Sequence, residues 1–208
     1  MPLPESECEE LLALARVGQD GALGRLLERY RAYLTLLARV QVGRRLQGKA
    51  DPADMVQETF LEAARHFGQF NGTTEPELAA WLRQILAGCL GHLVRRYCGT
   101  QARDVRLERT LEDELDQSSR AIDAGLVAEQ STPSQRASRR EQAVLLADAL
   151  DRLPPDYREV IILRHLEGLS FPEVAARMGR SLDSVEKLWV RALPRLRRAL
   201  GEKHERDA

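Results

Sequence analysis

The chain has 208 residues, of which 43% are hydrophobic, 30% charged and 5% aromatic. That apolar content can build a folded core and excludes fibrous, collagen-like and wholly disordered classes. The longest apolar-rich run without charge, residues 84–94, is too short to span a membrane. The acidic start of the chain differs from a signal peptide, and three cysteines are too few for a disulfide framework, so we expect a cytoplasmic protein.

Charge alternates along the chain although the formal net charge is only −1. Residues 1–24 carry a net charge of −4 and residues 25–109 carry +5. Residues 110–135 then carry −5 and residues 136–208 carry +3. Nearly all the basic residues are arginine, whose planar guanidinium suits phosphates and guanine edges. The pattern indicates two mildly basic modules separated by acid, and it favours nucleic-acid binding only modestly.

Helical periodicity dominates the first module. Apolar residues at spacings of one, three and four form one stripe over residues 23–40. Asp51 and Pro52 predict the N-cap and first turn of a second helix, whose apolar side runs to Phe67. Thr74 and Glu77 have the spacing of a capping box and predict the start of a third helix, which we expect to end near Gly99. These helices can bury their apolar faces only against one another, so residues 10–100 are predicted as one domain.

Residues 101–135 have weaker periodicity and are predicted as a linker, with some helix near 107–115 or 121–128. Residues 136–201 are predicted as a second helical domain. In it, a short helix opens with a capping box at Ser170 and Glu173, and a turn at Gly179 precedes a longer helix that starts after Ser181. These are the proportions of a helix-turn-helix. We therefore expect an all-α fold of two small domains.

Two blocks of this sequence resemble one protein family. The run DMVQETF at residues 54–60, the run AWLRQIL at 80–86 and Arg95-Arg96 resemble conserved region two of extracytoplasmic-function (ECF) RNA polymerase sigma factors. Residues 153–175 resemble region four of the same family, in the expected order. The GTTE run at 72–75, with LVRRY at 93–97, is also similar to a sub-group of this family that is abundant in planctomycete-type bacteria. The resemblance implies a cytoplasmic protein that acts by binding, with no cofactor, no metal and no catalysis of its own.

The resemblance implies core RNA polymerase, through its clamp coiled coil and flap, and promoter DNA as partners; an anti-sigma factor is a further partner that the family allows. For polymerase binding it points to Asp54, Gln57, Glu58 and Phe60. For the −10 element it implies a loop that captures a base flipped out of the stack, together with basic residues that grip phosphates. The expected −10 residues are Phe70, Asn71, Thr73, Thr74, Arg83, Gln84, Arg95 and Arg96. Trp81 lies within an apolar stripe, so core packing is favoured for it over base stacking.

The N-terminal half of the last helix is expected to read the −35 element in the major groove. Its candidate readers and phosphate contacts are Arg164, Arg180, Ser181, Asp183, Ser184, Glu186, Lys187, Val190 and Arg191. Two of its features depart from the family pattern. Glu186 can accept from cytosine but repels phosphate, and Pro194 is expected to kink or end the helix.

Other interpretations remain open at this stage. The chain could be a helix-turn-helix regulator that binds duplex DNA without polymerase, or a sigma-like interaction protein without promoter reading, which Glu186 and Pro194 motivate. A metal site at Cys89, His92 and Cys98 is disfavoured because a fourth ligand is not evident.

Overall fold

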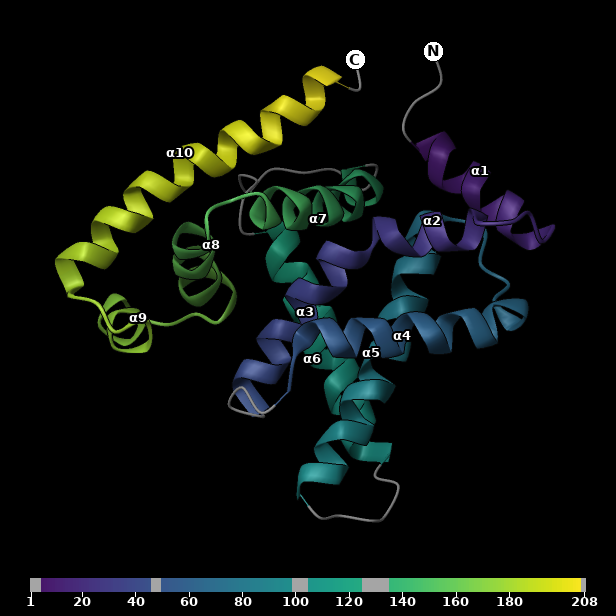
Figure 1. Cartoon of the computed structure of the whole chain (residues 1–208), viewed down its shortest axis with the longest axis horizontal. Helices are drawn as coiled ribbons and strands as arrows, with labels where there is room; N and C mark the ends of the chain where they lie inside the picture. Colours follow the sequence, from purple (N-terminus) through teal and green to yellow (C-terminus); the bar gives the residue numbers. More distant parts are fainter. Residues whose placement is uncertain (1–4, 46–49, 99–104, 125–134, 207–208) are drawn as a thin grey trace.

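The computed structural model describes residues 5–45, 50–98, 105–124 and 135–206, and within these ranges the regular elements are helices, with no strand. This confirms the predicted all-α class for the described residues. Figure 1 shows the helices in chain order, with α10 along one edge of the molecule. The elements are α1 (Glu5–Arg16), α2 (Ala22–Arg29), α3 (Arg31–Arg45), α4 (Pro52–His66), the 3₁₀ turn η1 (Phe67–Gln69), α5 (Glu75–Cys98), α6 (Val105–Ala124), α7 (Gln135–Asp151), α8 (Pro155–Ile161), the π-helical turn η2 (Ile162–Leu166), α9 (Phe171–Met178) and α10 (Leu182–Arg206).

The start of the chain differs from the predicted pattern. The stripe over residues 23–40 is divided at Tyr30, which forms the C-cap of α2. Tyr30 is fully buried and its hydroxyl pairs with the Cys8 sulfur of α1 at 3.6 Å. The sequence pattern predicts no helix in this acidic N-terminal segment, yet α1 buries Leu12 and packs on α2. Cys8 and Leu12 of α1 are therefore buried together with Tyr30 in the core.

Helices α3, α4, α5 and α6 form the central packing unit. Leu78, Leu82, Leu86 and Leu90 recur on one face of α5 and are buried. Helix α6 packs along α5 and contacts α3, and it buries Leu111 and Leu115 at helical spacing. It occupies much of the segment predicted as a linker. The domain boundaries stay a prediction. The predicted helix end at Gly99 and residues 131–134 of the predicted linker lie outside the described residues.

The predicted helix-turn-helix is confirmed as α9, a turn at residues 179–181 and α10. Helix α10 packs on α7, α8 and α9, while α7 also packs on α3 and α6. The second group of helices is thus seated on the first (Figure 1). Pro194 does not end α10, which continues to Arg206. Proline leaves only the carbonyl one turn earlier without its helical donor, and that residue, Val190, is exposed, so water can reach this side of the helix.

Among the described residues, no helix combines the length and the apolar character that crossing a membrane requires.

Candidate functional site

The α4 face presents three of the four residues expected to hold a partner. The Asp51 carboxylate caps α4 by accepting from the Ala53 N–H at 2.8 Å. Asp54, Gln57 and Glu58 are exposed, and their spacing places them on one side of the helix. Phe60 differs, because it is only 8% exposed and its ring lies 4.9 Å beneath the Arg31 guanidinium. The structure therefore makes Phe60 a core residue and leaves a polar, acidic face for binding.

The loop between η1 and α5 begins with an aromatic anchor. Phe70 is buried, and its ring stacks on Trp81 with centroids 4.8 Å apart. Phe67 packs beside both rings, at 6.2 Å from Phe70 and 6.3 Å from Trp81. Trp81 thus takes part in core packing, as the apolar stripe indicated, and Phe70 fixes one end of the loop.

Glu77 fixes the other end of this loop. Its carboxylate accepts from the backbone N–H groups of Thr73 at 2.7 Å and Thr74 at 3.0 Å, and from the Thr74 hydroxyl at 2.9 Å. The predicted capping box is confirmed by these contacts and by the Glu77 N–H bond to the Thr74 hydroxyl. The Thr73 and Thr74 N–H groups, with the Thr74 hydroxyl, lower the pKa of Glu77. The exposed side chains of Asn71 and Thr73 therefore stand on a fixed backbone.

Gly72 is required in this loop by close approach. A Cβ built on Gly72 would lie 2.4 Å from the Phe70 ring and 2.8 Å from the Glu77 Cβ. On the other side, the Arg16 side chain at the end of α1 donates to the Gly72 carbonyl. A cavity of about 360 Å³ opens beside the loop, lined by Arg16, Phe67, Gly68, Phe70 and Asn71.

The basic residues of α5 divide into buried and exposed members. Arg83 is only 8% exposed, and its guanidinium donates to the Asp116 carboxylate at 2.7 Å and to the Tyr33 hydroxyl at 3.1 Å. The expected phosphate contact at Arg83 is therefore not available in this structure, because α6 covers it. Arg95 is half-buried and pairs with Glu108 of α6 at 2.9 Å. Gln84 and Arg96 are exposed.

A wider groove of about 710 Å³ runs between α4 and α5. It joins the acidic α4 face to the exposed Arg96, and it includes Glu62, His66 and His92, which no sequence motif marks as binding residues. Burial raises the pKa of Cys89 in this groove to about 11, so its thiol remains protonated at neutral pH. Protonated thiol is a poor metal ligand and a poor nucleophile.

The helix-turn-helix is built from two local signals. The Ser170 hydroxyl and N–H both bond Glu173 at the start of α9, at 2.6 and 2.7 Å, which confirms the predicted capping box. Gly179 ends α9 with a φ of 61°, a conformation that favours glycine. Ser181 then caps α10 by accepting from the Ser184 N–H at 3.3 Å.

The two arginines expected near the −35 element have partners within the protein. The Arg164 guanidinium donates to the Leu169 carbonyl at 3.0 Å and lies 5.0 Å over the Phe171 ring. Arg180 pairs with Asp156 at 2.6 Å and remains partly exposed. A half-exposed ion pair in water is worth less than about 1 kcal/mol, so Arg180 can exchange this partner for a phosphate.

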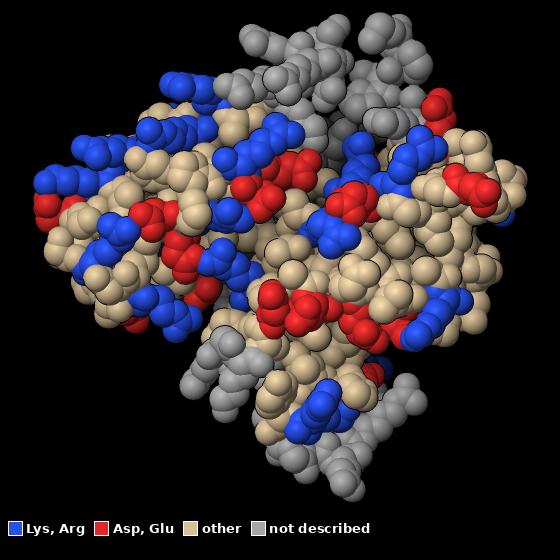
Figure 2. Space-filling model, viewed as in Figure 1, with Lys and Arg blue, Asp and Glu red and all other residues tan. Residues whose placement is uncertain are grey.

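One face of α10 is open to solvent, and basic side chains follow the outer edge of this helix in Figure 2. Val185 and Ala192 are buried, and the Trp189 ring N–H donates to His165 at 3.0 Å. These contacts fix the rear of the helix. Asp183 and Lys187 pair at 2.7 Å on the open side. The expected readers that are exposed are Ser181, Asp183, Glu186, Lys187, Val190 and Arg191, while Ser184 is half-buried.

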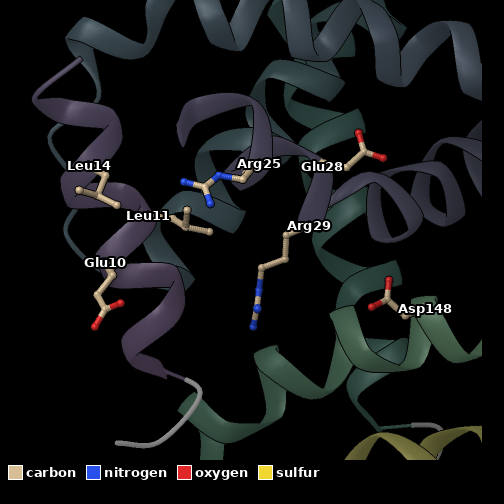
Figure 3. Close-up of a pocket in the computed structure, with 7 residues that line it drawn as sticks. All are labelled: Glu10, Leu11, Leu14, Arg25, Glu28, Arg29 and Asp148. Carbon is tan, nitrogen blue, oxygen red and sulfur yellow. The ribbon is translucent and has the colours of Figure 1, made fainter. Parts of the chain in front are cut away.

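A separate hollow of about 520 Å³ lies among α1, α2 and α7 and contains none of the predicted site residues (Figure 3). Negatively charged carboxylates, positively charged guanidinium groups and two leucines line it. Its lining residues are Glu10, Leu11, Leu14, Arg25, Glu28, Arg29 and Asp148.

The order of α9, a short turn and α10, with one face of α10 open to solvent, is the arrangement of helix-turn-helix proteins. Residues 143–196 match the family model described as Sigma-70, region 4. RNA polymerase sigma factor CarQ of Myxococcus xanthus is 31% identical over 162 residues, which cover 77% of this chain and 81% of CarQ. RNA polymerase sigma-E factor of Streptomyces antibioticus is 33% identical over 164 residues, 76% of each chain.

ECF RNA polymerase sigma factor BldN of Streptomyces coelicolor is 31% identical over 191 residues, 92% of this chain, and the chain spans 65% of the length of BldN. A solved RsbN–BldN complex matches at 28% identity with a TM-score of 0.30, covering 90% of this chain and 97% of the matched chain. The chain belongs to the ECF RNA polymerase sigma factors. The planctomycete sub-group stays a prediction.

Proposed function

We propose that this chain directs core RNA polymerase to promoters and helps to open them, acting in the cytoplasm by binding and without catalysis of its own. The observation that carries the proposal is the open reading face of α10 within the segment that matches sigma region 4. The side chains there offer both hydrogen-bond donors and hydrogen-bond acceptors, as reading base edges in the major groove requires. The rear of the helix is held by Val185 and Ala192, so the reading face is presented on a fixed support.

The −10 element is assigned to the loop at residues 70–74. Asn71 can donate and accept hydrogen bonds, which edge reading of a displaced base requires, and it stands exposed between the fixed Phe70 and Gly72. Arg96 and Gln84 are the exposed α5 residues that can reach the melted strand, while Arg83 is left out because it is buried. The anti-sigma factor expected from the family remains a proposal for this chain.

The polymerase contact is assigned to the exposed α4 face of Asp54, Gln57 and Glu58. Removing both charges, as Asp54→Asn with Glu58→Gln, is expected to weaken binding to core RNA polymerase about tenfold or more, because charge-assisted contacts are lost. The measurement is fluorescence anisotropy of the labelled chain titrated with core polymerase. The matched control, Glu9→Gln with Glu10→Gln on α1, removes the same charge from exposed positions and should bind like the unmodified chain. An unchanged dissociation constant for the α4 variant would contradict this docking face.

Start-site-specific transcription from genomic promoter fragments tests the whole proposal. We expect specific transcripts only when the chain and core polymerase are both present. Specific DNA binding by the chain alone, without transcription, would instead support a free-standing regulator. Polymerase binding with no initiation would support a sigma-like interaction protein.

A further inference from the structure

Arg16 joins the N-terminal helix to the −10 loop, although no motif of the sequence assigned it a role. It is the last residue of α1, and its exposed guanidinium donates to the carbonyl of Gly72, which lies 56 positions further along the chain. Arg16 and Glu77 thereby hold the loop from two directions. The Glu77 carboxylate binds the N–H groups of Thr73 and Thr74, and Arg16 binds the carbonyl before them.

The cavity beside this loop has chemistry that suits a nucleobase. Its volume of about 360 Å³ lies at the lower end of the range for small-molecule sites, about 300–1,000 Å³. Phe67 and Phe70 line its apolar side, although each residue is only 9% exposed because the rings pack on each other and on Trp81. Asn71 supplies an amide, and the Arg16 guanidinium supplies a fork of donors that matches the acceptor edge of a base such as guanine. An apolar wall, an amide and a guanidinium therefore face one hollow.

We propose that Arg16 is a specificity-determining residue of the −10 site: its guanidinium positions the Gly72 carbonyl and forms one wall of the cavity that receives the displaced base. This inference rests on the proposed function, because it assigns a residue to the loop that reads the −10 element. It brings α1 into promoter recognition, whereas the motifs of the chain confine that task to the segments around α5 and α10.

A promoter library in which the −10 and −35 elements are both randomised tests this assignment. Transcription by core polymerase with each variant is followed by sequencing of the transcribed templates, so that base preference is measured at every position. Arg16→Ala should reduce discrimination at one −10 position about tenfold, the effect expected for loss of a hydrogen bond from a charged donor. Preference at the −35 element and the thermal midpoint should not change. Arg16→Lys keeps the charge but replaces the planar fork of donors with a compact ammonium, so it should retain only part of the preference.

Arg25→Ala is the matched control, since it removes another exposed arginine that lines the separate hollow in Figure 3. It should reproduce the preference of the unmodified chain. Retention of the full −10 preference by Arg16→Ala would overturn the assignment, as would an equal loss at the −10 and −35 elements. If the unmodified chain selects no −10 sequence at all, the proposed function fails, and the role of Arg16 fails with it.

Discussion

Gly72→Ala is expected to disturb the −10 loop while leaving the helices in place. The added Cβ would lie 2.4 Å from the Phe70 ring and 2.8 Å from the Glu77 Cβ, whereas carbon atoms pack at about 3.5–4.0 Å. The ring must move by more than about 1 Å, but it is stacked on Trp81. The backbone is held by the bonds from Thr73 and Thr74 to Glu77. Such overpacking costs about 1–3 kcal/mol.

Thermal unfolding measures this loss, and a chain of this size loses about 2–4 °C in midpoint for each kcal/mol. Gly24→Ala is the control, because a Cβ at Gly24 meets no atom within 4 Å and the site is an exposed helix interior. That variant should be slightly stabilised, by about 0.5–1 kcal/mol. Equal midpoints for Gly72→Ala and the unmodified chain would refute the argument that close packing demands glycine in this loop.

Two further predictions concern the charged caps of α5 and α9. Ser170→Ala removes the N-cap hydroxyl of α9 and should cost about 1 kcal/mol in urea unfolding, and no shift in the urea midpoint would contradict the capping role. Acid should also destabilise the fold. The Ser170 hydroxyl and N–H lower the pKa of Glu173, and the N–H groups of Thr73 and Thr74 lower that of Glu77. Because both pKa values are depressed in the folded state, their stabilisation is complete above the unfolded value of about 4.3 and is lost as pH falls through the folded values. Urea unfolding at about pH 6 and pH 3.5 checks this, and Ser170→Ala should show a smaller acid-induced loss, since it lacks the main cause of the Glu173 shift.

Local signals predicted the helix starts well, because a cap needs only residues that are near in sequence. Asp51, Thr74 and Ser170 each cap the helix that their motifs indicated. The helix-turn-helix follows from the same signals together with Gly179, because its turn is also marked by residues that are near in sequence.

The sequence was least informative where a residue's environment comes from a distant segment. Arg83 has the local pattern of a phosphate contact, but it is bound by Tyr33 of α3 and Asp116 of α6. These partners are distant in sequence, and α6 lies where a linker is predicted. Phe60 matched its motif, but the Arg31 guanidinium and the core cover its ring. Arg16 carried no local signal at all, since its contact with Gly72 appears only when α1 is folded onto the first module.

Helix α7 has a consequence for how far apart the proposed −10 loop and the proposed −35 surface can stand. It packs on α3 and α6 from the first group of helices and on α10 from the second, and it buries Val144, Leu146 and Leu150. Separating the two groups would expose these apolar side chains to water, at a free-energy cost of about 25 cal/mol for each Å² of apolar surface. The distance between the two surfaces is therefore set by the apolar packing of α7 against both groups of helices. Under the proposed function, a promoter whose spacing differs from this distance is engaged only if the contacts with polymerase and DNA offset the free energy of separating the two groups of helices.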